Sequence, residues 1–357
     1  MDHVMIWGQF LVASALIIFA GYKLTRYGDI LSEKLHLGHV FIGAMLIGWS
    51  TSLPEFVLST GTTMQGHPEI ALGNIVGSNL FNIFILVLLD ICYWKGPILK
   101  KANPKVKLTI NISLIMIILL GVALWARCTQ KVPFIPMGYD TLTLLVVYFI
   151  ATFIMYLSEK KSPTEEDDEA PIPDKYNNIS LGILLLYCFF VIVIIIGSGY
   201  WMSFISTKIE RTYASLSGSF VGSCFLAIVS SLPEVITSFM AVRLGFVNMA
   251  FGICFGSNIF NVILISISDI FYQCKFNTGN ILLDGHIDPC VYYPAIICIM
   301  LMTLTVLFVI MFLNKRERKF FIGIESIILA ILYFFAMYTI YNPGFWNQLT
   351  CFTCKCQ

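Results

Sequence analysis

The feature that most constrains this chain is an internal repeat with a fixed offset of 179 residues. The stretch 41–91 matches 220–270 without a gap, at 17 of 51 positions. Since chance matches in an apolar chain would fall on Leu, Ile, Val or Phe, conserved Ser, Pro, Glu, Gly and Asn indicate a tandem duplication. Polar residues kept twice within hydrophobic surroundings are typical of transporters built from two repeats. The repeated words are Ser-Leu-Pro-Glu at 52–55 and 231–234, and Gly-Ser-Asn at 77–79 and 256–258.

Composition places the chain in a lipid bilayer. Hydrophobic residues make up 58% of the 357 residues, charged residues 12%, and the mean hydropathy is +0.83. Soluble proteins carry roughly 25% charged residues, so this chain lacks the polar side chains that would cover a water-exposed surface. The net charge of +1 gives no reason to expect a nucleic-acid partner.

Ten hydrophobic stretches reach or approach the ~20 residues that a membrane-spanning helix needs. They predict an all-α polytopic membrane protein, with ten transmembrane helices as two inverted five-helix repeats. The first repeat covers 1–157 and the second 179–345; an acidic, disordered linker at 158–178 joins them, and a Cys-containing tail follows at 346–357. The predicted helices lie at 5–24, 39–64, 69–93, 106–126, 140–157, 179–202, 216–243, 248–272, 290–313 and 320–341.

The distribution of basic residues predicts the orientation of these helices. The loops on the side of the acidic linker hold 16 of the 22 Lys and Arg residues, and the other side, with both termini, holds 6. The linker should therefore face the cytoplasm and both termini the opposite side. An odd number of helices separates each repeat from its copy, so the repeats should insert in opposite orientations and meet near the bilayer midplane.

Glu55 and Glu234 are predicted to lie near the middle of the second and seventh helices. A carboxylate at that depth costs at least about 2.5 kcal/mol, so it must be buried in protein and matched to a cation or a proton. The alternative is a protonated side chain that hydrogen-bonds a neighbouring helix. Matched positions in both repeats, each after a proline, favour a functional ion site.

Oxygen donors accompany both glutamates in the sequence. Pro54 and Pro233 are expected to free backbone carbonyls about one turn earlier, near Gly48 and Trp49 and near Ala227 and Ile228. Ca²⁺ prefers six to eight oxygen ligands, and Na⁺, of similar size, accepts the same kind of cage. No His or Cys lies within the paired motifs, which disfavours zinc and copper. The candidate hydroxyl donors beside the glutamates are Thr51, Ser52, Ser230 and Ser231.

The second repeated block is expected to form the other wall of the site. Glycines recur every four residues at 73 and 77 and at 252 and 256, which predicts close packing of the third and eighth helices. That packing would bring Ser78, Asn82, Ser257 and Asn261 to the depth of the carboxylates. Asn79 and Asn258 are expected to make interhelical hydrogen bonds, and the repeated Asp90 and Asp269 to make capping or interface contacts.

Charge then predicts a mechanism. Two ionised glutamates carry −2, which one Ca²⁺ or two Na⁺ would neutralise. Since the ions would compete for the same carboxylates, their transport would be coupled. The sequence thus predicts a secondary-active antiporter, without cofactor or enzymatic activity, whose only partners are the transported ions and the bilayer.

With these motifs the chain resembles the cation/Ca²⁺ exchanger superfamily, and within it the compact Na⁺/Ca²⁺ exchangers of prokaryotic type. The family's two repeats read approximately Gly-Thr-Ser-Leu-Pro-Glu, then Gly-Asn-x-x-Gly-Ser-Asn-x-x-Asn/Asp. This chain has the two motifs at 50–55 and 73–82, and their copies at 229–234 and 252–261. The resemblance covers both repeats, hence nearly the whole chain.

The resemblance implies a role for each matching residue. Glu55 and Glu234 would be shared by Ca²⁺ and Na⁺, and Thr51 and Ser230 would give oxygens to both kinds of ion. Helices one and six would slide past the core to alternate access. The remaining ligands implied are Ser78 and Ser257 with the carbonyls of Gly48 and Ala227 at flanking Na⁺ sites, and Asn82 and Asn261 at the central site.

The chain departs from the family pattern at several positions. Ser50 and Val229 replace glycines, Ser230 replaces Thr, and Ile253 replaces the Asn of Gly-Asn. Asn261 stands where many relatives have Asp, which argues against K⁺ dependence and removes a proton site. The linker is too short for the Ca²⁺-sensing domains of animal exchangers, and a monomer is expected.

Three alternatives to Na⁺/Ca²⁺ exchange remain at this point. The nearest is H⁺/Ca²⁺ exchange, or exchange of another divalent cation, because two membrane glutamates can also bind protons. An intramembrane hydrolase is disfavoured because all five His residues lie at predicted helix ends or in loops. A non-transporting homologue is disfavoured because both glutamates are intact. The protein is expected in the cell membrane or an organellar membrane.

Overall fold

The computed structural model describes residues 2–35, 41–93, 98–101, 106–128, 139–161, 180–212, 224, 226–276, 293–308 and 324–342. Every regular element in these ranges is a helix, and each of the ten predicted hydrophobic stretches contains helix. Most of the acidic linker (162–178) and the whole Cys-containing tail lie outside the described residues. The predictions made for those two segments are therefore not addressed by the structure.

The first five crossings belong to the first repeat and the last five to the second. The first repeat contains α1 (Asp2–Leu35), then η1 (Ile42–Ile47), α3 (Gly48–Thr51) and α4 (Leu53–Met64), then α5 (Pro68–Cys92), a short η2 (Ile98–Lys101), α6 (Lys107–Cys128) and α7 (Tyr139–Lys161). The second contains α8 (Leu181–Thr212), α10 (Ala227–Ser230) with α11 (Leu232–Leu244), α12 (Val247–Phe276), α13 (Tyr293–Phe308) and α14 (Ile324–Tyr341).

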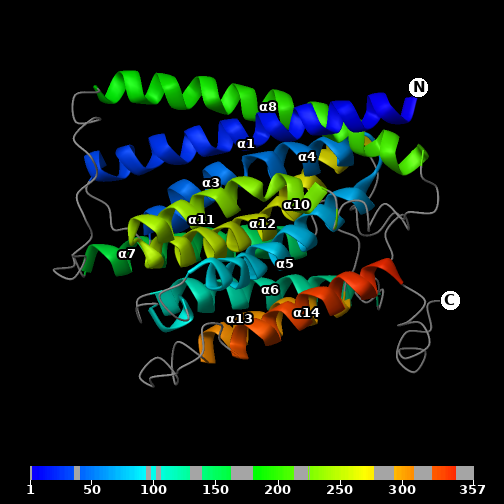
Figure 1. Ribbon diagram of the computed structural model, residues 1–357. Coiled ribbons are helices and arrows are strands. Elements are labelled where there is room, and N and C mark those ends of the chain that lie inside the picture. Colours follow the sequence, from blue (N-terminus) through cyan, green and yellow to red (C-terminus); the bar gives the residue numbers. More distant parts are fainter. Residues whose placement is uncertain are drawn as a thin grey trace.

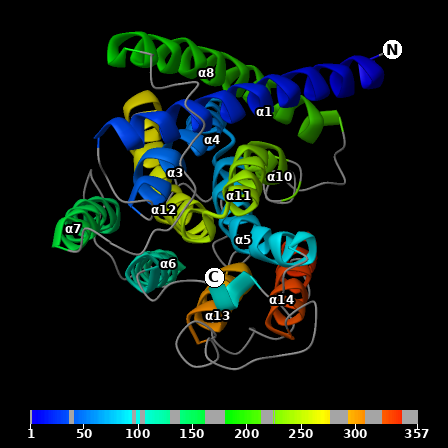
Figure 2. The same cartoon turned by 60° about the vertical axis from the view of Figure 1, so that its left-hand side comes forward.

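The helices form a central group between two outer layers (Figures 1 and 2). α1 and α8 run antiparallel along one side, as expected for matching helices of inverted repeats. α6, α7, α13 and α14 lie on the opposite side. The central group consists of α4, α5, α11 and α12 and the short segments η1, α3 and α10. Both α1 and α8 extend about ten residues beyond their predicted ends, since their polar last turns gave no hydrophobic signal.

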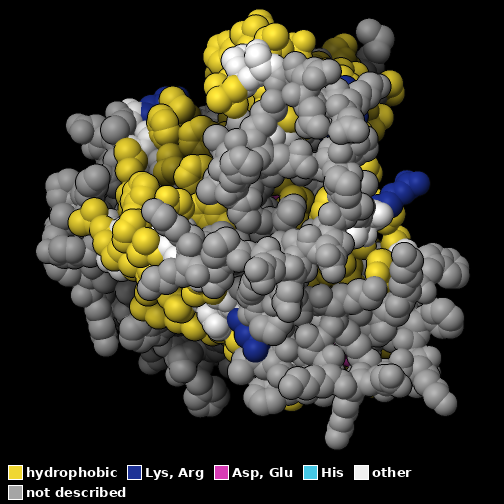
Figure 3. Space-filling model, turned by 90° about the vertical axis from the view of Figure 1, so that its left-hand side faces the viewer, with side chains coloured by type: hydrophobic (Ala, Val, Ile, Leu, Met, Phe, Trp, Pro, Cys, Tyr) yellow, Lys and Arg dark blue, Asp and Glu magenta, His cyan; other side chains and the backbone are white. Residues whose placement is uncertain are grey.

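Burial separates the central helices from those that face lipid. The apolar span of α12 is 89% buried and that of α5 is 78% buried, against 22% for α8 and 28% for α7. Large apolar side chains such as Phe149, Phe189 and Phe334 point outward, and apolar side chains dominate the described surface in Figure 3. Since outer helices expose apolar groups while the central ones are enclosed, lipid contacts only the periphery.

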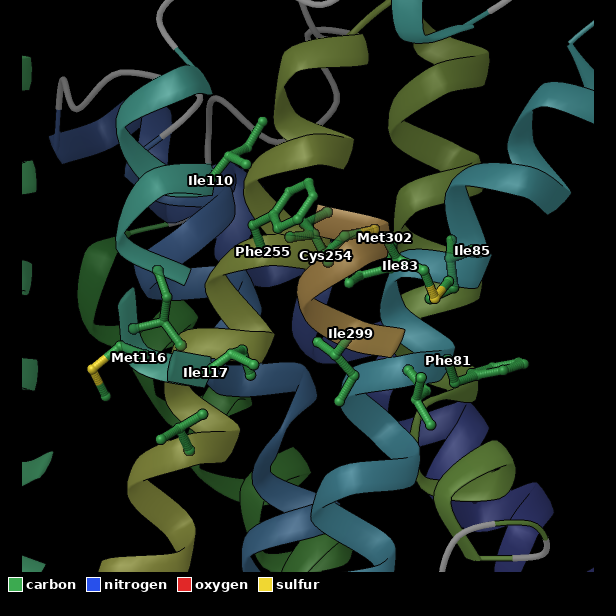
Figure 4. Packing of buried hydrophobic residues seen from close by; sticks show 14 of the residues in the cluster. Phe81, Ile83, Ile85, Ile110, Met116, Ile117, Cys254, Phe255, Ile299 and Met302 are labelled. Atoms are coloured by element: carbon green, nitrogen blue, oxygen red, sulfur yellow. The ribbon is translucent and has the colours of Figure 1, made fainter. Parts of the chain in front are cut away.

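Apolar side chains from α5, α6, α12 and α13 fill the space between the central group and the outer layer that contains α6 and α13 (Figure 4). Ile83, Ile117, Phe255 and Ile299 are among those fully enclosed there. This packing is continuous over both repeats, so it fixes α5 and α12 relative to each other.

Close glycine packing occurs at Gly256, where α12 also approaches the second crossing. A Cβ at Gly256 would collide with the backbone of Ala44 in η1, so at this position α12 packs directly on the second crossing. The predicted packing of the third helix on the eighth is also present, because α5 and α12 contact each other. Gly43 makes the reciprocal approach, because its Cβ would lie 2.8 Å from the carbonyl oxygen of Met249. Small residues permit such backbone contacts between membrane helices.

Asp90 and Asp269 make the interface contacts predicted for them. Asp90 accepts hydrogen bonds from the Ser326 hydroxyl of α14 (2.6 Å) and from the Ile98 amide of η2 (2.7 Å). Asp269 accepts one from the Thr141 hydroxyl of α7 (2.7 Å). Each buried aspartate thus ties a central helix to the last helix of the opposite repeat.

The hydrogen bonds from Ser326 to Asp90 and from Thr141 to Asp269 should contribute to stability and not to ion binding. We expect Ser326→Ala and Thr141→Val each to lower the free energy of unfolding by about 1–3 kcal/mol, because a buried carboxylate oxygen loses its donor. Thermal unfolding in detergent would measure the loss, and the ion concentration for half-maximal transport should stay unchanged. An unchanged melting temperature in both variants would contradict this role.

Candidate functional site

Both Ser-Leu-Pro-Glu motifs break the helix that carries them. Ser52 and Ser231 have nearly identical backbone angles, φ −86° and ψ 7° against φ −88° and ψ 7°, and end α3 and α10. A new helix begins at the next residue, with the proline in its first turn, where its missing amide hydrogen costs nothing. The second and seventh crossings are therefore discontinuous helices, which is how transporters expose backbone polarity at a central site.

Glu55 and Glu234 lie in the first turns of α4 and α11, and both are fully buried. The amino end of a helix carries partial positive charge, so this position favours a carboxylate. Both glutamates lie at the start of a new helix because the serine before them ends the previous helix and the proline begins the next one.

Hydrogen bonds connect the two Ser-Leu-Pro-Glu motifs to each other. The Ser231 hydroxyl donates to Glu55 Oε1 at 2.9 Å, and the Ser52 hydroxyl donates to Glu234 Oε1 at 3.1 Å. Each serine therefore serves the glutamate of the other repeat, whereas the sequence had paired it with its own. The two bonds join equivalent positions of the two repeats, so the twofold relation between the repeats extends to these side chains.

Ser78 and Ser257 reach the carboxylates as predicted. Ser78 on α5 donates to Glu55 Oε1 and Ser257 on α12 donates to Glu234 Oε1, both at 3.4 Å. The Ser257 hydroxyl also lies 3.2 Å from the Gly48 carbonyl oxygen. The second repeated block thus forms the opposite wall of the same polar cluster.

The carbonyls of Gly48 and Ala227 are present in the cluster but are not freed by the prolines. Gly48 O accepts the Ser52 amide (3.1 Å) and Ala227 O accepts the Ser231 amide (3.0 Å). The hydroxyls of Thr51 and Ser230 point to the same two carbonyls, at 3.2 and 3.3 Å. A proline removes the amide that would bond the carbonyl four residues earlier, so the prediction named positions too far upstream.

Four asparagines of the repeated motifs, Asn79 and Asn82 on α5 and Asn258 and Asn261 on α12, are fully buried. Asn82 Nδ2 donates to Asn258 Oδ1 at 3.1 Å, and Asn258 Nδ2 donates to the backbone oxygen of Asn79 at 3.2 Å. The interhelical bond predicted for Asn258 is confirmed, while that predicted for the Asn79 side chain is not formed. Within the described residues, no hydrogen bond joins Asn82 or Asn261 to either glutamate.

Several buried oxygens of this cluster have no hydrogen-bond partner among the described residues. They are Oε2 of Glu55, Oε2 of Glu234, and the side-chain oxygens of Asn79, Asn82 and Asn261. A buried polar atom without a partner costs about 1–3 kcal/mol. Hard cations bind carboxylate and amide oxygens, so the donor set has the chemistry of a Ca²⁺ or Na⁺ site.

Sequence reasoning missed two features. The π-helix η1 directly precedes the first motif, and such segments often occur at functional sites. Asn74 bonds both Ser59, at 3.1 Å, and Ser230, at 3.2 Å. Ser59 matches Ser238 at the 179-residue offset, and this match could have indicated that Ser59 belongs to the polar cluster.

A multi-pass helical bundle of two inverted repeats, with discontinuous helices meeting at a buried polar cluster, defines a secondary transporter. The family model for the sodium/calcium exchanger protein matches residues 5–157 and 182–342. The chain belongs to this family, whose members are membrane transporters rather than enzymes and lie within the cation/Ca²⁺ exchanger superfamily.

Relatives and solved structures agree with this family. The putative antiporter CaxA of Alkalimonas amylolytica is 24% identical over 319 residues, 86% of this chain and 90% of that protein. The sodium-calcium exchanger NCX_Mj superposes with a TM-score of 0.61 at 19% identity, over 94% of this chain and 98% of that one. The H⁺/Ca²⁺ exchanger CAX superposes with a TM-score of 0.65 at 15% identity, over 98% and 91%. At these identities the two structures show the fold alone.

Proposed function

We propose that this protein is a Na⁺/Ca²⁺ antiporter in which both ions compete for Glu55 and Glu234. A cation antiporter of the Na⁺/Ca²⁺ or H⁺/Ca²⁺ type follows from the family; the coupling ion and the site residues are the added proposal. The observation that carries it is the pair of fully buried carboxylates, each with Oε1 held by serines and Oε2 without a partner among the described residues.

The proposed ion ligands fall into three groups around these carboxylates. The hydroxyls of Ser52 and Ser231 hold one oxygen of each carboxylate, which leaves the other oxygen for a cation. Thr51 with the Gly48 carbonyl and Ser257 would line one flank, and Ser230 with the Ala227 carbonyl and Ser78 the other. Asn82 and Asn261 would add neutral oxygens at the centre.

Na⁺ is favoured over H⁺ as the coupling ion by the charge of the site. In the described part of the repeated motifs, two carboxylates face the cluster and the position matching Asn82 is Asn261, which cannot carry a proton at neutral pH. One Ca²⁺ or two Na⁺ would leave the site neutral, and the many hydroxyls suit Na⁺, which needs oxygen ligands and no full charge.

Around this site we propose the domain arrangement given by the sequence. Repeat one covers 1–157 and repeat two covers 179–345, with the linker in the cytoplasm and both termini on the other side. α1 and α8, which pack on each other outside the core, would slide past it during alternating access. A monomer in the cell membrane is proposed, because the described polar cluster draws on both repeats of one chain.

The coupling ion is tested in proteoliposomes that contain the purified protein. Vesicles loaded with Na⁺ and diluted into Na⁺-free buffer at equal internal and external pH should take up ⁴⁵Ca²⁺. We expect uptake to disappear when internal Na⁺ is replaced by choline, and a pH gradient alone to drive none. Uptake that ignores Na⁺ but follows the pH gradient would establish H⁺/Ca²⁺ exchange instead.

A further inference from the structure

The two flanks of the proposed site are not equivalent, because one repeated position differs. Asn74 in the first repeat corresponds to Ile253 in the second. Both side chains are fully buried, on α5 and α12 respectively. At this position the first repeat therefore has an amide that can bond two partners, and the second repeat has an aliphatic side chain.

Asn74 connects three elements through its amide group. Its Nδ2 donates to Ser59 on α4 at 3.1 Å, and its Oδ1 accepts from Ser230 on α10 at 3.2 Å. The bond to Ser59 fixes which end of the amide faces Ser230. All three side chains are buried, at 0–2% exposure, so water does not compete for these bonds.

Ser230 directly precedes Ser231, whose hydroxyl donates to Glu55 Oε1 at 2.9 Å. A hydroxyl that ligates a cation must turn its lone pairs toward the ion, so its single hydrogen needs another acceptor. Asn74 Oδ1 is such an acceptor and is not itself one of the proposed ligands. Ser230 can therefore present its oxygen to an ion without losing its hydrogen bond.

Thr51, at the equivalent position, lacks this arrangement. Its hydroxyl donates to the Gly48 carbonyl at 3.2 Å, as the Ser230 hydroxyl also does to the Ala227 carbonyl at 3.3 Å, and both carbonyls are proposed ligands. Ile253 has no acceptor, and the hydroxyl of Ser238, the counterpart of Ser59, meets the Cys254 sulfur at 3.7 Å instead. Cys254 lies among the apolar side chains in Figure 4.

We propose that Asn74 is a positioning residue that orients the Ser230 hydroxyl for ion binding, so that the Ser230 flank binds cations more tightly than the Thr51 flank. This inference rests on the proposed cation site. The difference in cation affinity between the two flanks would then come from the amide of Asn74. Asn74 would affect ion binding only through Ser230.

A double-mutant cycle between Asn74→Leu and Ser230→Ala tests the proposal. The measurement is the Ca²⁺ dissociation constant of the purified full-length protein in detergent, obtained from the rise of the melting temperature with Ca²⁺ concentration, since a ligand that binds the folded state raises the melting temperature. Each single change should raise that constant about tenfold. The double change should also raise it about tenfold, because the second substitution finds the interaction already lost.

Matched controls separate positioning from a general loss of packing. Ser238→Ala removes the hydroxyl at the counterpart of Ser59, which meets the Cys254 sulfur and is not a proposed ligand, so it should remain within about twofold of the wild type. Asn74→Leu combined with Thr51→Ala should instead multiply the two single effects. If Asn74→Leu does not fold, Asn74→Ala takes its place in the cycle.

The outcomes are distinguishable. Multiplying effects of Asn74 and Ser230, with Ca²⁺ still stabilising the wild type, would overturn the positioning role and leave the transport site standing. If neither Ca²⁺ nor Na⁺ stabilises the wild type and it moves no ⁴⁵Ca²⁺, the proposed function fails and the inference fails with it.

Discussion

Replacing Glu55 by Gln should abolish Na⁺-dependent ⁴⁵Ca²⁺ uptake, with a rate at least about 100-fold below that of the wild type. Gln keeps the size of the side chain and removes its charge. Breaking a buried charge pair costs about 3–5 kcal/mol, which corresponds to two or more powers of ten in affinity. Uptake by matched amounts of folded protein in Na⁺-loaded proteoliposomes would measure the loss.

The repeat supplies two further expectations for this variant. Glu234→Gln should have a loss of similar size, because Glu234 is equally buried and has equivalent serine partners. Glu69→Gln is the matched control, since it makes the same chemical change on a side chain that is 21% exposed and lies beside His67. Uptake by Glu55→Gln within tenfold of the Glu69→Gln rate would contradict the proposed site.

Replacing Gly256 by Ala should destabilise the protein and stop transport together. The added Cβ would meet the backbone of Ala44 in η1, which cannot move aside as a flexible side chain could. Overpacking of this kind costs about 1–3 kcal/mol or more. The neighbouring Ser257 would shift as well, and with it the contacts to Gly48 and Glu234.

Thermal unfolding and uptake measure the two consequences of Gly256→Ala. We expect a melting temperature lower by roughly 5 °C or more and uptake below about a tenth of the wild-type rate. Gly197→Ala on α8 is the control, because its Cβ would have no atom within 4 Å. Equal behaviour of the two variants would show that the contact between α12 and η1 is not tight in the membrane.

Much of the fold could be predicted because membrane insertion leaves a strong signal in the sequence. Each central crossing is continuous in hydropathy even where the helix is broken, so the ten crossings and the twofold arrangement were readable from composition and offset. Helix ends were less predictable: α1 and α8 extend into polar residues, since backbone hydrogen bonding continues after the apolar run stops.

Several members of the buried polar cluster could be predicted from the sequence, but most of the hydrogen bonds between them could not. Glu55, Glu234, Ser78 and Ser257 meet as the repeated spacing implied. Spacing along one chain cannot show that Ser52 and Ser231 exchange partners between repeats, because that bond depends on how two distant helix breaks approach. The same limit hid the bond between Asn74 and Ser230, which lie 156 residues apart.

The most direct test of shared carboxylates is equilibrium ⁴⁵Ca²⁺ binding to the purified protein at rising Na⁺ concentration and constant pH. We expect one Ca²⁺ to bind per chain and to be displaced by Na⁺ with a Hill coefficient above one, because at least two Na⁺ replace each Ca²⁺. The Glu55→Gln variant should bind no Ca²⁺. Ca²⁺ that stays bound at every Na⁺ concentration, or that binds equally well to Glu55→Gln, would contradict a common site.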